Sequence, residues 1–294
     1  MRLRFAFCLL GAVAFSAAPP EPVAAKIGSF EGTVSLYAKN LDTGKAIGVR
    51  EDEPVRTAST IKLPILCALY SAVQQGKVRW TELLTLYEPE KVSGSGVIRE
   101  FSHGLKFPVR DLASMMIVVS DNTATNMILD RISTDFVNAE MEQLGLRRTR
   151  SLRKILGDGT DLKSTVSGVS KEGALEENQK YGIGVSTPAE MVMLLEKIER
   201  GQMVSPAASR EMIAMLKRQQ YKDGIGRRTR HAVASKSGAL DALRSDVGIV
   251  YSPGGRIAMA ITVDGMPKID YSADNAGNIL IADLATMLVD LLRR

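Results

Sequence analysis

The order of strand-like and helix-like patterns along the chain limits its fold more than any other feature of the sequence. Residues 32–50 predict a β-hairpin, because apolar positions alternate on either side of a turn at 42–44. Strand patterns return only near the end, at 247–251 and 257–263. Strands at both ends with helices between them favour one α/β domain built from both chain ends, with a helical domain inserted.

The middle of the chain, residues 57–200, predicts mainly helix and loop. Apolar periodicity and capping signals predict helices over 59–75, 108–119, 122–132 and 135–144, then from Thr187, from Ser205, and over 278–292. Thr187 is the clearest start, with proline next and glutamate three residues on. Residues 151–186 show no clear period, and a loop this long in a compact protein is usually functional.

The N-terminus predicts a signal peptide over residues 1–25. A short basic stretch precedes the uncharged residues 5–18, prolines then interrupt any helix, and small residues offer a cleavage site after Ala25. We therefore expect a secreted or periplasmic protein without stable membrane insertion after cleavage; a retained anchor is the alternative. The expected domains are 26–57 with 216–294, forming the α/β domain, and 58–215, the helical domain that contains the loop 151–186.

Composition excludes several classes of function. The formal charge is +5, but no basic run is interleaved with aromatic residues, so we expect no nucleic-acid partner. Two histidines argue against a multi-histidine metal site, and nothing in the sequence requires a metal or organic cofactor. Cleavage would leave one cysteine, Cys67, in an apolar run that predicts a buried thiol. We expect a monomer.

The first candidate motif is Ser59-Thr60-Ile61-Lys62. Positions three apart share a helix face, so the Lys62 amine can reach the Ser59 hydroxyl and accept its proton where burial disfavours the charged amine. The start of a helix also offers free N–H groups to developing negative charge. Alone the motif is weak: Ser59 could be an ordinary helix cap, and Ser151 and Lys154 repeat the spacing by chance.

Two further motifs follow in order. In Ser120-Asp121-Asn122, Ser120 would provide a proton-shuttling hydroxyl and Asn122 an amide for the substrate, although all three residues are common helix caps. In Lys236-Ser237-Gly238, the lysine and the hydroxyl would hold a substrate carboxylate, and Gly238 would let the substrate approach the backbone. A solvated strand end is the alternative for this last motif.

The ordered set, in these contexts, resembles the class A β-lactamases and penicillin-binding proteins. Stretches similar to that family run from 58–64 to 236–250, and the resemblance covers nearly all of the mature chain. It implies an α+β fold: a five-stranded antiparallel sheet flanked by helices, beside an all-helical domain, with the active site between them. It also implies a β-lactam or a D-Ala-D-Ala-like substrate, and so a link to antibiotic resistance.

The same resemblance implies roles for individual residues. Ser59 would be acylated, Lys62 would act as base or proton relay, and the N–H groups of Ser59 and Ala239 would form the oxyanion hole. Lys236 and Ser237 would hold the carboxylate, together with Arg244, whose position matches only approximately.

The resemblance breaks down in the loop 151–186. Class A enzymes carry there a glutamate followed four residues later by asparagine, and this chain has no such pair. Glu172 is the candidate for the missing deacylating base. The alternative interpretation is that Glu172 is only a solvated charge of the loop. Three hypotheses therefore stay open: a β-lactam hydrolase, a penicillin-binding D-alanyl-D-alanine peptidase with slow deacylation, and a non-catalytic cell-wall-binding module.

Overall fold

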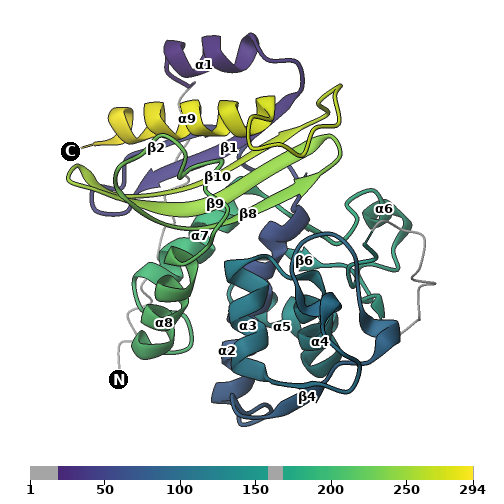
Figure 1. The fold of residues 1–294 in the computed structure, drawn as a ribbon. Coiled ribbons are helices and arrows are strands. Elements are labelled where there is room, and N and C mark those ends of the chain that lie inside the picture. Colours follow the sequence, from purple (N-terminus) through teal and green to yellow (C-terminus); the bar gives the residue numbers. More distant parts are fainter. Residues whose placement is uncertain (1–18, 158–167, 294) are drawn as a thin grey trace, which may run out of the picture.

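A five-stranded antiparallel sheet forms one side of the molecule. The computed structural model describes residues 19–157 and 168–293, and its sheet has the strand order β2-β1-β10-β9-β8 (Figure 1). The strands are β1 Thr33–Asn40, β2 Ala46–Val49, β8 Ala232–Leu240, β9 Leu243–Ser252 and β10 Gly255–Asp264. Both ends of the chain thus contribute to one sheet, as predicted, and β8 lies at its edge.

Helices cover both faces of this sheet. On one face lies α9 (Ala276–Leu292), with α1 (Glu21–Gly28) beyond it (Figure 1). On the other lie α7 (Pro188–Glu199) and α8 (Pro206–Lys217). Alternation along β1 explains the two layers, because Leu36 and Ala38 pack towards α9 while Tyr37 packs with the core on the opposite face. The fold that the resemblance implied is therefore confirmed.

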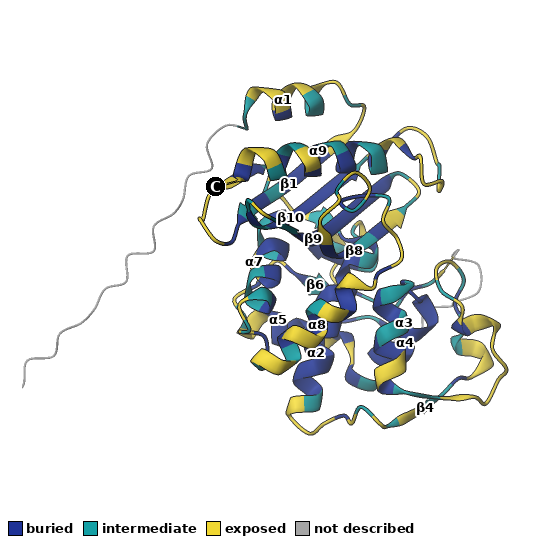
Figure 2. Cartoon of the chain, turned by 60° about the vertical axis from the view of Figure 1, so that its left-hand side comes forward, coloured by how far each residue is buried: buried dark blue, intermediate teal, exposed yellow. Residues whose placement is uncertain are grey.

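The helical part packs around α2, which is buried along almost its whole length (Figure 2). Its helices are α2 Lys62–Gln74, α3 Val109–Val118, α4 Asn122–Ile132 and α5 Thr134–Gln143. Cys67 of α2 is fully buried, as its apolar surroundings predicted, and this burial raises the pKa of its thiol. Short elements complete this part: β3 Val55–Arg56, η1 Ala58–Ile61, β4 Leu83–Thr85, η2 Glu88–Glu90, η3 Ile98–Glu100, β5 Lys106–Pro108, β6 Arg150–Ser151, α6 Glu176–Gln179 and β7 Gly184–Ser186.

The long loop is more structured than its sequence indicated. β6 and β7 pair with each other, and β7 also pairs with β3. Strands of two or three residues are too short to show an alternating pattern, so local patterns do not predict them. Residues 158–167 of this loop, including the acidic Asp158, lie outside the described residues.

Helices α7 and α8 bind the two parts of the molecule together. The predicted domain boundary at 215 assigns α7 and all but the last two residues of α8 to the helical domain. Both helices nevertheless contact strands of the sheet as well as each other. Within α7, Leu194, Leu195 and Ile198 belong to the same buried cluster as residues of α2 and the sheet. One continuous core therefore fixes the sheet edge against the helical part.

The N-terminal segment departs from one sequence expectation. Prolines at 19, 20 and 22 do not prevent a helix, because α1 begins at Glu21 and proline is tolerated in the first turn. Val23 is buried beside α9, and Lys26 forms a 2.6 Å ion pair with Asp283. The expected cut after Ala25 would fall within this helix. Among the described helices, none combines the length and apolarity needed to cross a bilayer.

Candidate active site

Ser59 lies in the short helical turn η1, immediately before α2. Lys62 begins α2, and its backbone N–H donates to the carbonyls of Ser59 and Thr60. Ala58, just before the serine, has a φ of 47°, a left-handed conformation that is unfavourable for a residue with a side chain. Strain of this kind persists where the surroundings enforce it, and here it fixes how Ser59 is presented.

The third motif meets Ser59 through a close backbone approach. A β-carbon placed on Gly238 would lie 2.8 Å from the amide nitrogen of Ser59 and 2.9 Å from the carbonyl oxygen of Thr57. Because both atoms belong to the backbone, only glycine fits at 238. The edge strand β8 therefore runs directly beside η1.

The first and second motifs meet at the Lys62 side chain. Its Nζ donates to the Ser120 carbonyl at 2.6 Å and to Asn122 Oδ1 at 2.8 Å, and it lies 3.1 Å from Ser120 Oγ. The side chain is fully buried. Ser120 itself has a φ of 55°, which is again a left-handed conformation. Ser120 is thus held between α3 and α4 with its hydroxyl against the amine.

The second and third motifs meet at the same hydroxyl. Lys236 Nζ lies 3.0 Å from Ser120 Oγ and donates to the Ser237 carbonyl at 2.7 Å. The two lysines therefore approach one hydroxyl from α2 and from β8. The structure brings Lys62, Ser120, Asn122, Lys236 and Ser237 into one polar cluster beside Ser59.

Burial of two amines so close together alters their ionisation. Burial, reinforced by the charge of Lys236, holds the pKa of Lys62 well below its usual value. Burial also lowers the pKa of Lys236, to about 7, although the Asp246 carboxylate partly offsets this. The cluster can therefore hold a neutral amine, as a base, beside an amine that is only partly charged near pH 7.

A loop packed on the second motif fixes Asn122 and Asp121. Asn122 Nδ2 donates to the Ser93 carbonyl at 2.9 Å, and the Asn122 backbone N–H donates to the Ser95 carbonyl. Asp121 caps α4 by accepting from the Ala124 N–H, and its other oxygen accepts from the N–H groups of Val97 and Ile98. Asp121 is therefore a structural anchor within the motif.

The predicted oxyanion hole has suitable backbone geometry. The N–H of Ser237 points away from β9, towards the free edge of β8. Since N–H groups two residues apart point the same way in a strand, the N–H of Ala239 faces that edge as well. It thus points to the side of β8 on which η1 lies, as an oxyanion hole shared with the Ser59 N–H requires.

Two predicted residues do not join the cluster. The Arg244 guanidinium donates to the carbonyls of Leu240, Leu243 and Asp270, and it stacks on the Tyr271 ring at 4.9 Å. Glu172 is half-buried, and its backbone carbonyl accepts from Asn178 Nδ2. Within the described residues, no hydrogen bond connects either side chain to the polar cluster.

Two residues that the sequence did not single out do contact the cluster. Gln219, just after α8, accepts from the backbone N–H of Ser237 at 2.7 Å. Asp246, opposite Ser237 on β9, is buried, and burial raises the pKa of its carboxyl to about 6. Neither belongs to a motif, and only the register of the sheet and the end of α8 place them here.

In the part of the chain that the structure describes, no hydrogen bond places a carboxylate against Lys62, where it could activate water. Over residues 19–157 and 168–293, none of the hydrogen bonds of Lys62 or Ser120 goes to a carboxylate, and the nearby charge acting on Lys62 besides Lys236 is Asp121. Across the same residues, no group of three or more His, Cys, Asp or Glu is placed to hold a metal.

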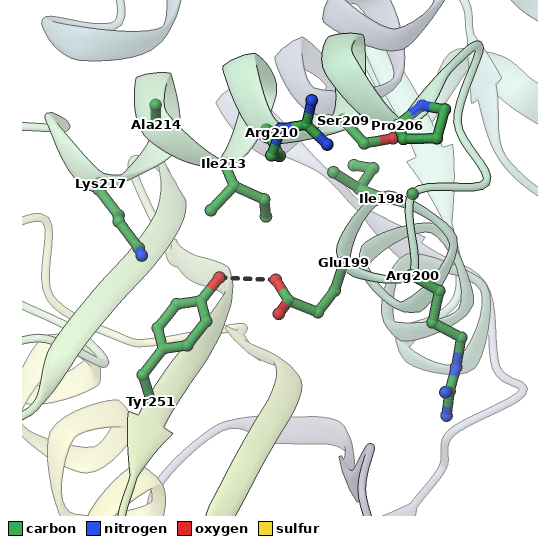
Figure 3. A pocket seen from close by; sticks show the side chains of 11 residues that line it. Ile198, Glu199, Arg200, Pro206, Ser209, Arg210, Ile213, Ala214, Lys217 and Tyr251 are labelled. Carbon is green, nitrogen blue, oxygen red and sulfur yellow. Dashed lines mark hydrogen bonds between the residues drawn. The ribbon is translucent and has the colours of Figure 1, made fainter.

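A separate cavity of about 470 Å³ lies between α7, α8 and the end of β9 (Figure 3). Within it the Tyr251 hydroxyl donates to Glu199 at 2.7 Å, and the Lys217 ammonium lies 4.1 Å from the centre of the Tyr251 ring. It shares no lining residue with the polar cluster, so it is a different feature of the molecule.

Comparison with known proteins agrees with this arrangement. A model described as the β-lactamase enzyme family matches residues 21–292. The crystal structure of a β-lactamase from Sphaerobacter thermophilus is 28% identical, has a TM-score of 0.78, and is matched over 92% of this chain and 96% of that one. A variant of PBP-A in an acyl-enzyme complex with penicillin G is 26% identical, with a TM-score of 0.76 and coverage of 94% and 98%. A β-lactamase regulatory protein of Streptomyces cacaoi is 23% identical, over 89% of this chain and 93% of the relative.

Proposed function

This chain belongs to the β-lactamase enzyme family, and from that premise we propose that it is a serine hydrolase that opens β-lactam rings through an acyl-enzyme on Ser59. The observation that carries the proposal is the convergence of Lys62 and Lys236 on the Ser120 hydroxyl, beside Ser59. A protein that only bound its ligand would not need to bury two amines against one hydroxyl, because that burial is unfavourable for folding.

The geometry supports a specific acylation step. Neutral Lys62 takes the Ser59 proton as Ser59 Oγ attacks the lactam carbonyl carbon, and the N–H groups of Ser59 and Ala239 stabilise the oxyanion. The carbon–nitrogen bond of the ring then breaks, and a proton passes from Lys62 through Ser120 Oγ to the leaving nitrogen. Lys236 stabilises the negative charge of the substrate carboxylate, and the neighbouring Ser237 hydroxyl donates a hydrogen bond to the same carboxylate. Water must finally cleave the ester on Ser59 to regenerate the enzyme.

One observation favours a second candidate function, a penicillin-binding D-alanyl-D-alanine peptidase with slow deacylation. The hydrogen bonds of Lys62 go to neutral oxygens, and the described residues place no carboxylate against it or Ser120. Acylation needs only the groups present, whereas rapid turnover also needs an activated water. The two candidates therefore share the first chemical step and differ in the lifetime of the acyl-enzyme.

The decisive experiment follows colour and mass together. The protein is mixed with a chromogenic cephalosporin, and its intact mass is recorded at intervals. Sustained colour with a transient adduct supports the hydrolase, and one equivalent of colour with a lasting adduct supports the slow peptidase. The absence of any adduct and any colour would refute both and would favour a binding or regulatory role.

Ser59→Ala tests the identity of the nucleophile. It should abolish the adduct. Ser151→Ala is a matched control, because Ser151 has the same spacing to a lysine, but Lys154 is paired with Asp130 at 2.6 Å. The control variant should be acylated like the wild type. An adduct that persists in Ser59→Ala would assign the nucleophile elsewhere.

A further inference from the structure

Gln219 contacts the residues that would hold the substrate carboxylate. Its amide oxygen accepts from the backbone N–H of Ser237 at 2.7 Å, from Ser237 Oγ at 3.1 Å and from Lys236 Nζ at 3.5 Å. These are the donors that a substrate carboxylate would use. Gln219 is only 1% exposed, so its side chain is shielded from solvent.

The position of this amide is fixed from several sides. The backbone N–H of Ser237 can only donate, so it must face the amide oxygen, and the amide Nε2 then donates to Ser235 Oγ at 2.8 Å. The backbone N–H of Gln219 donates to Leu216, in the last turn of α8, and that of Gln220 donates to Val118 at the end of α3. The amide oxygen is therefore held against Ser237 before any substrate arrives.

The direction of the Ser237 hydroxyl bond follows from the chemistry of the two groups. An amide oxygen can only accept, so the Ser237 hydroxyl must be the donor in this bond. A hydroxyl has one proton, and an ionised carboxylate also only accepts. Ser237 can therefore donate to Gln219 or to a substrate carboxylate, but not fully to both.

We propose that Gln219 is a resident acceptor that competes with the substrate carboxylate for the Ser237 proton and for a Lys236 N–H. Gln219 acts through these two residues, so it is a positioning residue. It limits how much a carboxylate on the substrate increases the acylation rate constant. The inference concerns β-lactams that carry a carboxylate beside the ring nitrogen, and it rests on the proposed acylation of Ser59.

Two substitutions separate competition from simple support of the strand. Gln219→Met keeps a similar volume but removes the acceptor, so it frees the Ser237 hydroxyl and the Lys236 ammonium. Gln219→Glu keeps an acceptor but adds negative charge, so it holds both donors more tightly and repels a second carboxylate. Competition predicts opposite effects of the two variants. If Gln219 only positioned Ser237 for the substrate, Met would be harmful and Glu would be tolerated.

The measurement compares two substrates that differ in one group. The acylation rate constants of benzylpenicillin and its methyl ester are obtained by intact mass for each variant, and their ratio is taken. General damage to the enzyme affects both substrates and cancels in this ratio. Gln219→Met should raise the acid-to-ester ratio about fivefold, which is the effect expected of one neutral hydrogen bond. Gln219→Glu should lower the same ratio by about fivefold or more. Gln220→Met, at the exposed neighbouring position, should leave the ratio unchanged.

The outcomes distinguish this inference from the proposed function. A ratio that falls in Gln219→Met, or that is unchanged in Gln219→Glu, overturns the competition while acylation of the wild type still stands. If Gln219→Met does not fold, as a thermal melt would reveal, the Glu variant alone decides. A wild type that neither penicillin acylates overturns the proposed function and this inference together.

Discussion

At the scale of single residues, the candidate site is defined by groups held in unfavourable states. Ala58 and Ser120 have positive φ angles of 47° and 55°, and two lysines are buried around one hydroxyl. Each of these features opposes folding, so the rest of the molecule must stabilise them. Strained backbone and buried charge are here concentrated around one hydroxyl. This is expected of a site selected for chemistry and not for stability.

Ionisation of the two lysines predicts how acylation depends on pH. Burial, reinforced by the charge of Lys236, holds the pKa of Lys62 well below its usual value, so the acylation rate constant should rise as Lys62 loses its proton and becomes a base. The rate constant should fall again near pH 7 as Lys236, with a pKa of about 7, loses the charge that binds the carboxylate. In Lys236→Arg the falling limb should move to far higher pH, since arginine stays protonated. An unchanged falling limb in that variant would contradict the assignment.

The close approach at Gly238 predicts a large effect from one methyl group. In Gly238→Ala the new β-carbon would meet backbone atoms of Ser59 and Thr57, so the strand or the turn must shift. A displacement of about 1 Å at a reacting group can reduce a rate constant about 100-fold. We expect a loss of at least about tenfold in the acylation rate constant, measured by intact mass. Gly28→Ala, where an added β-carbon meets open space, should change nothing.

Sequence alone identified the residues that belong to short motifs but not those that support them. Ser59, Lys62, Ser120 and Lys236 could be proposed because their order along the chain is distinctive, although each motif is weak by itself. Gln219 and Asp246 had no such signal. They reach the polar cluster only because β8 pairs with β9 in one register and because α8 ends beside β8, and both facts depend on tertiary contacts.

At the scale of elements, capping signals located helix starts well. Thr187 and Ser205 do cap α7 and α8 through their side chains, as predicted. Short pairings and contacts between distant segments were not predictable, because they depend on neighbours that a local pattern does not contain. The strands β3, β6 and β7 and the contact of α7 with the sheet are the main examples.

The cap of α4 predicts an effect on stability that exceeds that of an ordinary cap. Asp121 satisfies the N–H groups of Ala124, Val97 and Ile98, so Asp121→Ala would leave three donors without their acceptor, two of them from the loop that packs on Asn122. We expect a loss of about 2–4 kcal/mol in the free energy of unfolding, measured by urea denaturation. Ser205→Ala, which removes the cap of α8, should cost about 1 kcal/mol. Equal losses in the two variants would show that the loop contacts contribute nothing.

At the scale of the whole molecule, one sheet separates two hydrophobic cores. One core lies between the sheet, α9 and α1, and the other joins α2, α7 and α8 to the opposite face. The polar cluster lies where η1 and α2 meet the edge strand β8. Relative motion of the two parts of the molecule would separate Lys62 from Lys236, so the large shared core keeps the site assembled.

Burial of the site lysines makes the stability of the whole molecule depend on pH. The pKa of Lys236 is about 7 in the folded protein and near 10.5 when exposed, so between these values the unfolded chain binds more protons. The free energy of unfolding should therefore rise with pH across this window, by at most about 1.4 kcal/mol per pH unit for one group. The same stability is lost as the pH falls from about 10.5 to about 7. The lowered pKa of Lys62 makes the free energy of unfolding rise with pH in the same way. Urea denaturation at pH 7, 8 and 9 should show this rise in the wild type and a smaller one in Lys236→Met, which removes one amine and the charge that depresses the other. A rise of equal size in both proteins would mean that the buried lysines do not cause the pH dependence of the free energy of unfolding.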